Sequence, residues 1–299
     1  MNQKNAKPFL KWAGGKTQLI TEIEKYFPPS LTNRKFVYVE PFVGSGAVLF
    51  WILNHFPQLE KAVINDINAD LIDTYQTIKS APEALISLLE VIQDEYHSLD
   101  GSDEQKKAYY YEKRSLFNKR EQNRTTHSAL FIFLNRTCFN GLYRVNRKNE
   151  YNVPIGSYKK PTICDKSNLL AVSEALQKVE LLYGDFEQTI DHTSENTLFY
   201  LDPPYKPLSE TSSFNSYAKG AFNDEEQIRL KQFCDKLNSS GHSWLLSNSD
   251  VKGQNATDNF FDDLYADFTI KRVTAKRIIN ALPKRRGCLK ELLITNQHV

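Results

Sequence analysis

The sequence predicts an α/β fold in which a mostly parallel sheet ends in an antiparallel edge. Short apolar runs bounded by Gly, Pro, Asn or Asp recur along the chain, and such runs indicate buried strands. Helical stretches accompany several of these runs, and this alternation is typical of a doubly wound sheet. Two strand-like segments near the end, joined by a basic loop, indicate the antiparallel edge.

The individual elements follow from these patterns in chain order. Parallel strands are expected at residues 36–40, 61–65, 179–183, 197–201 and 243–247. Helices are expected at residues 46–55, 69–80 and 224–239, and the edge strands at residues 268–273 and 291–295.

The chain changes character between residues 81 and 178. This part is helix-rich and basic, and it becomes rich in turns around residues 146–160. We therefore expect one domain built from residues 1–80 and 179–299, with residues 81–178 as an insertion. Within the insertion, residues 141–154 have apolar ends around a polar centre, which predicts a β-hairpin.

The composition is that of a globular protein. Hydrophobic residues make up 40% of the 299 residues and charged residues 25%. No run approaches the roughly 18 to 20 apolar residues of a membrane span, and the polar start carries no signal-peptide pattern, so a cytoplasmic protein without a membrane partner is expected. The 4 cysteines are too far apart for a zinc or redox motif, and no metal site is expected.

Basic residues are concentrated in two segments, although the formal net charge is only +2. Residues 271–290 contain eight Lys or Arg and no acidic residue. Residues 106–148 contain eleven Lys or Arg and two acidic residues. Such segments fit a surface that faces phosphates, although solvated helix faces that only keep the protein soluble would give the same pattern.

A glycine turn follows the first expected strand. Phe42, Gly44 and Gly46 lie between that strand and a helix, where glycines let the backbone approach a ligand and the helix start offers N–H groups. The next strand ends at Asp66, whose carboxylate can accept hydrogen bonds from both hydroxyls of a ribose. Together these features indicate a nucleotide-type site.

Two other nucleotide sites do not match this sequence. A dinucleotide fingerprint needs a third glycine where Leu49 stands, which argues against a dehydrogenase. A phosphate-binding P-loop ending at Gly15-Lys16-Thr17 would need a glycine where Leu10 stands, which argues against a kinase or ATPase.

The sequence Asp202-Pro203-Pro204-Tyr205 follows the fourth expected strand, at the edge of the sheet where open α/β folds bind ligands. The prolines make the loop rigid and leave its carbonyls without an internal donor. The Asp202 carboxylate and the Pro203 carbonyl could accept both hydrogens of an adenine N6 amino group, and the Tyr205 ring could stack on a base taken out of the helix. The other interpretation is a proline-rich surface turn in which Asp202 caps a helix.

Together with Trp12-Ala13-Gly14-Gly15-Lys16, these motifs resemble the class α DNA adenine-N6 methyltransferases, the Dam and DpnII-type group, in both residues and order. The resemblance covers essentially the whole chain. It implies a Rossmann-like S-adenosyl-L-methionine-dependent fold, with residues 81–178 as the target-recognition insertion. It places Trp12 and Lys16 near the methionine part of the cofactor, Asp66 on the ribose, Asp185 and Phe186 beside the adenine ring, and Asp202 against both cofactor and target.

The resemblance also implies a recognition segment of the branch that reads GATC. Its candidate residues are Asn140, Leu142, Arg144 and Pro154, with Arg144 as a bidentate contact to guanine or, alternatively, a contact to phosphate. Residues 207–212, just past Tyr205, match the DpnII-like branch and are expected to shape the target pocket.

The predicted activity is that of a site-specific DNA-methyltransferase (adenine-specific), which flips the base and transfers the methyl group directly, without a metal or a catalytic cysteine. None of the cysteines follows a proline, which argues against a cytosine-C5 enzyme, and Asp202 argues against a protein-glutamine methyltransferase. Another DNA sequence, an RNA adenine and a catalytically silent DNA-binding protein are the remaining alternatives. The expected partner is double-stranded DNA, bound by a monomer or weak dimer. The sequence does not decide between a solitary role and one beside a cognate restriction endonuclease.

Overall fold

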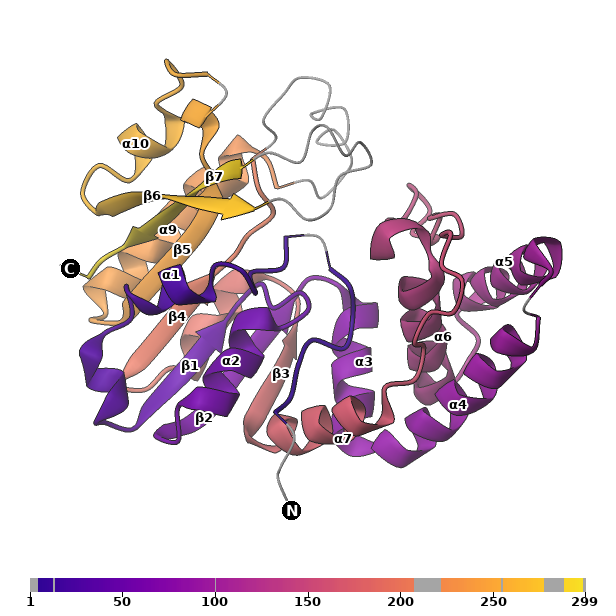
Figure 1. Cartoon of the computed structure of the whole chain (residues 1–299). Helices are drawn as coiled ribbons and strands as arrows, with labels where there is room; N and C mark the ends of the chain where they lie inside the picture. The colour runs from indigo at the N-terminus through magenta and orange to yellow at the C-terminus, as the bar shows by residue number, and fades with distance from the viewer. Residues whose placement is uncertain are drawn as a thin grey trace. The chain divides into compact units, whose positions relative to one another are not determined.

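The computed structural model describes residues 5–12, 14–99, 101–206, 222–253, 255–276 and 288–297. The chain divides into two compact units, whose elements are labelled in Figure 1. Unit 1 comprises Met1–Gly15, Gly44–Asn54 and Asp66–Gly184, and unit 2 comprises Lys16–Val43, His55–Asn65 and Asp185–Val299.

Unit 2 contains a mixed β-sheet. Its strands lie in the order β2 (Leu59–Asp66), β1 (Phe36–Glu40), β4 (Thr197–Leu201), β5 (Ser243–Ser249), β7 (Cys288–Thr295) and β6 (Thr269–Lys276). The pairs β1–β2, β1–β4 and β4–β5 are parallel, whereas β7 runs antiparallel to both β5 and β6. The expected mostly parallel sheet with an antiparallel edge is therefore confirmed.

The parallel strands β1 and β4 are buried along their whole length, which is why their sequences are continuous apolar runs without alternation. In the parallel register Val39 pairs with Phe199, so the two strands end at the same edge of the sheet. The segments that begin at Pro41 and Asp202 both leave the sheet there, and this edge is where open α/β sheets bind ligands.

The helices of unit 2 are α1 (Ile20–Glu24), α9 (Asp224–Ser239) and α10 (Phe260–Leu264), with short 3-10 helices η1 (Pro29–Thr32), η4 (Phe186–His192) and η5 (Val251–Gly253). Helix α9 begins where the Asn223 side chain accepts a hydrogen bond from the Glu226 backbone N–H at 3.0 Å. Its residue Phe233 packs edge-on against Phe199 of β4, which fixes the helix on the sheet.

Unit 1 is mainly helical. It contains α2 (Ala47–His55), α3 (Ala69–Ser80), α4 (Pro82–Ser98), α5 (Asp103–Lys119), α6 (Arg124–Thr137), η2 (Phe139–Gly141), α7 (Lys166–Ala175), η3 (Leu176–Lys178) and strand β3 (Val179–Tyr183). Helix α6 lies at its centre and packs on α3, α4 and α5 (Figure 1). Phe133 of α6 contacts the rings of Tyr96 and Tyr109 edge-on. Because α3 joins this core, the compact unit is larger than the expected insertion, and the functional division into a catalytic domain and an insertion stays a prediction.

Residues 141–154 form a short hairpin, in which the Asn152 N–H donates to the Arg144 carbonyl at 3.1 Å and the Asn146 N–H donates to the Glu150 carbonyl at 2.9 Å. Val145 and Tyr151 make a single antiparallel bridge, and Asn149 turns the chain with φ +62°. The Asn118 side chain accepts from the Tyr151 N–H at 2.8 Å and donates to the Tyr151 carbonyl at 3.0 Å. A helix side chain therefore satisfies the Tyr151 backbone groups that point away from the paired strand. We refer to residues 139–154 below as the recognition turn.

No described helix combines the length and apolar character that crossing a membrane requires.

Candidate active site

The glycine turn lies in unit 1, with Trp12 packed against it. Gly44 and Gly46 have positive φ angles of +49° and +73°, which other residues rarely adopt. A Cβ atom on Gly44 would lie 3.0 Å from the Trp12 indole, and one on Gly46 would lie 2.6 Å from the Tyr75 hydroxyl oxygen. Side chains are therefore excluded from both positions, and the turn keeps its backbone accessible for close approach.

Asp66 is fixed to the same turn. One of its carboxylate oxygens accepts a hydrogen bond from the Gly44 N–H at 3.1 Å, and the other accepts from the Asn68 N–H at 2.9 Å. Burial raises the pKa of Asp66, while these backbone bonds lower it. A carboxylate has about four lone-pair sites, so these two bonds leave capacity to accept ribose hydroxyls.

In unit 2, Phe42 and Phe186 form an aromatic pair with ring centroids 5.3 Å apart. Phe186 is buried, and the Arg229 guanidinium lies 4.2 Å from the centre of its ring. Asp185 accepts from the Glu187 N–H and forms a two-pronged ion pair with Arg229, at 3.0 and 2.8 Å. Asp185 and Phe186 are thus held rigidly beside Phe42, two residues before the glycine turn.

Asp202 is the centre of a polar cluster in unit 2. The Lys16 ammonium lies 3.0 Å from Asp202 Oδ1, and the Ser247 hydroxyl donates to the same oxygen at 2.9 Å. Lys16 is only 4% exposed, so its charge lies close to the carboxylate with little screening by water. Burial raises the pKa of Asp202, and Lys16 and Ser247 act against that shift.

Tyr205 joins this cluster through Glu291 of β7. The Tyr205 hydroxyl donates to Glu291 Oε2 at 2.7 Å, and the Lys16 ammonium lies 4.0 Å from the same oxygen. Lys16 also lies 4.6 Å from the centre of the Tyr205 ring, as a cation–π contact. Burial raises the pKa of both Glu291 and Tyr205. Sequence reasoning named Lys16, Asp202 and Tyr205 but missed Glu291 and Ser247.

The recognition turn in unit 1 carries the four residues expected to read DNA. Asn140 has a left-handed backbone, with φ +56°, and Leu142 follows it after Gly141. Arg144 is exposed, and its Nε donates to Asn152 Oδ1 at 2.7 Å. The Pro154 ring is exposed, while its carbonyl accepts from the Phe139 N–H at 2.9 Å and closes the turn.

Some of the expected residues lie outside the described part of the chain. These are Ala13, residues 207–212, and residues 277–287 of the basic segment 271–290. Within the described ranges, no group of three or more His, Cys, Asp or Glu side chains is arranged to hold a metal ion.

Comparison with known proteins decides the family. The model of a family described as D12 class N6 adenine-specific DNA methyltransferase matches residues 12–279. The chain belongs to this family. It is therefore a methyltransferase that acts on adenine N6 of DNA with S-adenosylmethionine as methyl donor.

Three relatives match this D12-class methyltransferase over nearly their whole length. It is 48% identical over 294 residues to the "Type II methyltransferase M.MjaIII" of Methanocaldococcus jannaschii, covering 97% of this chain and 99% of the relative. It is 39% identical over 300 residues to the "Type II methyltransferase M1.LlaDCHI" of Lactococcus lactis subsp. cremoris, covering 99% and 97%. It is 35% identical over 288 residues to a "DNA adenine methylase" of Haemophilus influenzae, covering 96% and 92%.

The residues present fit the methyl donor. Gly44 and Gly46 give a turn that any Cβ would obstruct, and the oxygens of Asp66 face the same backbone. Ile67, the next residue after Asp66, is a large apolar side chain that is 74% exposed, so a purine ring could pack against it. Sequence reasoning missed Ile67, because only the exposed fraction distinguishes it from the buried apolar residues of β2.

Proposed function

We propose that this methyltransferase modifies the adenine of 5'-GATC-3' in double-stranded DNA, after flipping the base out of the helix, by direct in-line transfer to N6. The observation that carries the proposal is the arrangement around Asp202, in which Lys16 and Ser247 hold one carboxylate oxygen at the end of β4. Two prolines and Tyr205 follow at once, so acceptors and a ring lie on one rigid loop.

The loop suits an exocyclic amino group as substrate. N6 has two hydrogens, for which the Asp202 carboxylate and the Pro203 carbonyl are the proposed acceptors, with Lys16 and Ser247 holding Asp202 at Oδ1. Accepting these hydrogens draws the nitrogen lone pair out of conjugation with the ring. When bound, S-adenosylmethionine supplies an electrophilic methyl group. Asp202, whose pKa is raised by burial, can hold the proton that N6 loses.

Aromatic side chains support base flipping. Lys16 lies over one face of the Tyr205 ring, and we propose that the extruded adenine stacks on the opposite face. Phe139, at the start of the recognition turn, is a large aromatic side chain that is 44% exposed. An exposed ring on a DNA-reading turn can enter the stack and occupy the space that a flipped base leaves.

The recognition turn supports reading of base edges. Arg144 is held by the neutral amide of Asn152, which orients the guanidinium without neutralising its charge. An oriented guanidinium can donate two hydrogen bonds to N7 and O6 of guanine in the major groove. Leu142 and Pro154 lie on the same turn and can contact the methyl group of thymine, while Asn140 offers an amide to adenine.

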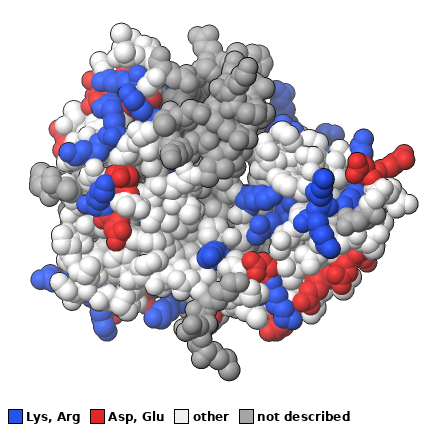
Figure 2. All heavy atoms as spheres, viewed as in Figure 1, with Lys and Arg blue, Asp and Glu red and all other residues white. Residues whose placement is uncertain are grey.

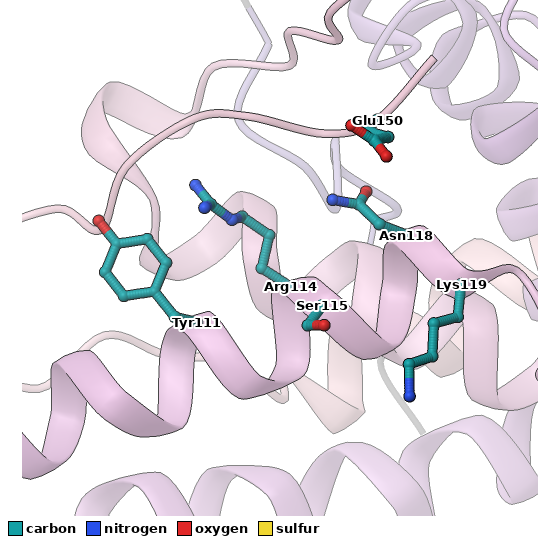
Figure 3. Close-up of a pocket in the computed structure, with 6 residues that line it drawn as sticks. All are labelled: Tyr111, Arg114, Ser115, Asn118, Lys119 and Glu150. Atoms are coloured by element: carbon teal, nitrogen blue, oxygen red, sulfur yellow. The ribbon is translucent and has the colours of Figure 1, made fainter. Parts of the chain in front are cut away.

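Beside the recognition turn is a hollow of about 450 Å³ suited to a phosphate (Figure 3). It is lined by Tyr111, Arg114, Ser115, Asn118 and Lys119 of α5 and by Glu150 of the turn. The Arg114 guanidinium lies 4.5 Å from the centre of the Tyr111 ring and donates to the Val153 carbonyl at 3.3 Å. Figure 2 shows several basic side chains on the visible face of unit 1, with acidic side chains near them. We propose that backbone phosphates bind here and set the register of the duplex.

We further propose that the enzyme protects DNA from a cognate restriction endonuclease. The support is that the two relatives at 48% and 39% identity are named Type II methyltransferases. Plasmid DNA from cells that express the protein should resist an endonuclease that cuts only unmethylated GATC. Complete cleavage of plasmid carrying the active enzyme would contradict the GATC assignment.

The decisive test is methyl transfer from labelled S-adenosylmethionine to two duplexes that differ only in carrying GATC or a scrambled site, followed by nucleoside analysis. The expected result is N6-methyladenine in the GATC duplex alone. Equal labelling of both duplexes would reject the sequence assignment. Asp202→Ala is the inactive control, which should bind the GATC duplex and transfer no methyl group.

A further inference from the structure

We infer that Tyr143 couples the recognition turn to the glycine turn around Gly44 and Gly46, called the cofactor turn below, as a positioning residue that makes DNA and cofactor bind cooperatively. The inference rests on the proposed role of the recognition turn in contacting DNA. Tyr143 immediately precedes Arg144 in the chain. Every contact that carries the inference lies within unit 1.

The ring of Tyr143 connects to the cofactor turn through Trp12. The two rings are stacked, with centroids 5.9 Å apart and an interplanar angle of 19°. Trp12 in turn packs on Gly44, where a Cβ would lie only 3.0 Å from the indole. Since the Gly44 N–H donates to Asp66, displacement of Trp12 would disturb a turn that holds the cofactor acid.

The hydroxyl of Tyr143 connects to the same region by a second route. It donates to Asp70 Oδ2 at 3.0 Å, and Asp70 lies in the first turn of α3, four residues after Asp66. Asp66 is itself tied to that helix start through the Asn68 N–H. Tyr143 therefore connects the recognition turn to both backbone donors of Asp66. Its ring reaches Gly44 through Trp12, and its hydroxyl reaches the helix start at Asn68 through Asp70.

Asp70 is a rigid anchor for this second route. The Arg120 guanidinium donates to its two oxygens at 2.7 and 3.0 Å, and His127 Nε2 lies 3.0 Å from Oδ1. The Asp70 side chain is only 5% exposed. Asp70 lies at the start of α3, His127 near the start of α6, and Arg120 directly after α5. Asp70 can therefore move only if these three helices move.

The consequence is a reciprocal effect on affinity. A ligand that orders Trp12 and the turn at Gly44 lowers the conformational entropy of Tyr143. The recognition turn then loses less conformational entropy when it binds DNA. By linkage, DNA must tighten cofactor binding by the same factor, for which about 5-fold or more is typical of coupled sites. The recognition turn thus reaches its binding conformation most readily when the cofactor turn is ordered.

The test measures binding rather than turnover. The dissociation constant of S-adenosylhomocysteine, which cannot transfer a methyl group, is measured by calorimetry with and without saturating GATC duplex. The wild-type protein should bind it about 5-fold or more tightly with duplex. In Tyr143→Leu, which removes the stack and the hydroxyl, the dissociation constant without duplex should rise about tenfold and the effect of the duplex should disappear.

Tyr143→Phe separates the two routes. It keeps the ring on Trp12, so cofactor affinity without duplex should stay within about twofold, whereas loss of the Asp70 bond should reduce the effect of the duplex. Tyr26→Leu changes a half-buried tyrosine of unit 2 and controls for a general loss of packing. If Tyr143→Leu is unstable, Tyr143→Phe decides alone, because it changes only the hydroxyl.

Two outcomes overturn the inference. One is a wild-type protein whose cofactor affinity does not respond to duplex. The other is an unchanged response in both Tyr143 variants. Failure of the proposed function looks different, since equal affinity for GATC and scrambled duplexes would reject the sequence assignment while any coupling could still be measured on either duplex.

Discussion

The Lys16 ammonium lies 3.0 Å from Asp202 Oδ1, and the two side chains are 4% and 20% exposed. Burial alone raises the pKa of Asp202 and would favour the neutral acid, whereas a neighbouring cation favours the carboxylate that accepts hydrogen bonds from N6. The pair therefore keeps a buried acid in the form that the chemistry uses.

Replacing Lys16 by Met should raise the pKa of Asp202 further. Since Asp202 is active as the carboxylate, the acid limb of the pH profile of kcat/KM should move to higher pH, and kcat at neutral pH should fall about 100-fold or more. Steady-state kinetics across the pH range measure both effects. Lys25→Met, which removes an exposed partner of Glu22, is the control and should leave the profile in place. An acid limb that does not move in Lys16→Met would show that Lys16 has another role.

Tyr205 is expected to act mainly through its ring. Tyr205→Phe removes the hydrogen bond to Glu291 but keeps the stacking surface, and kcat/KM should fall only a few-fold. Tyr205→Ala removes the surface that receives the base and should lower kcat/KM about 100-fold. Fluorescence of a duplex with 2-aminopurine at the target position reports flipping directly. Equal losses in the two variants would mean that the hydroxyl, rather than the ring, is the functional group.

Gly46→Ala should destabilise the protein and weaken cofactor binding. Its Cβ would meet the Tyr75 hydroxyl at 2.6 Å, in a backbone conformation with φ +73°. Moving Tyr75 would break its hydrogen bond to the Gly44 carbonyl, so a loss of about 3 kcal/mol in the free energy of unfolding is expected.

Gly241→Ala provides the matched control for this substitution. Gly241 has a similar φ of +76°, but a Cβ there would meet nothing within 4 Å. Only the backbone penalty of about 1 kcal/mol is expected, with cofactor affinity unchanged. Denaturant melts and calorimetry compare the two variants, and equal stability losses would contradict the steric argument at Gly46.

Asp70→Asn should lower the free energy of unfolding at neutral pH by about 2 kcal/mol. This is less than the cost of breaking a fully buried ion pair, because Arg120 is 36% exposed and water screens its charge. Burial opposes the charge of Asp70, but the hydrogen bonds from His127 and Arg120 together hold its pKa well below the usual range. The stability that the carboxylate contributes is therefore present above the unfolded-state pKa of about 4 and is lost as pH falls below it.

The difference between Asp70→Asn and wild type should accordingly shrink as the pH of the denaturant melts is lowered from 7 toward 3. Asp73→Asn, on the same helix, removes an exposed partner of Arg124 and should change stability by less than about 0.5 kcal/mol at any pH. A difference for Asp70→Asn that grows toward low pH would reverse the assigned direction of the pKa shift.

Much of the fold was predictable because β1 and β4 are buried along their whole length, so that their sequences are continuous apolar runs. Strands at residues 36–40, 179–183 and 197–201 have the bounds that the apolar runs predict, while β5 and both edge strands are longer than predicted. The recognition turn contains the predicted hairpin pairing, but its attachment to Asn118, a residue of α5, could not be predicted from local sequence.

The candidate site was predictable where a motif lies within one loop. Gly44, Gly46 and Asp202 could be named from their place after strands, and Asp66 from its distance along the chain. Glu291 could not, because its relation to Tyr205 arises only when β7 pairs with β5. Its one signal is an acidic residue directly before the apolar run of residues 292–294. Tyr143 carried no signal either, since its partners Trp12 and Asp70 come from distant segments.

The cluster of Lys16, Asp202 and Glu291 also has a consequence for the timing of biosynthesis. Lys16 leaves the ribosome early, whereas Glu291 belongs to the last strand that the structure describes. At about 5 to 20 residues per second, on the order of 15 to 55 seconds separate the synthesis of the two residues. A nascent chain or a fragment cut before β7 holds Asp202 without its complete set of neighbours. A chain that lacks β7 should therefore not methylate DNA, and methylation should begin only after β7 has been made and has paired with β5.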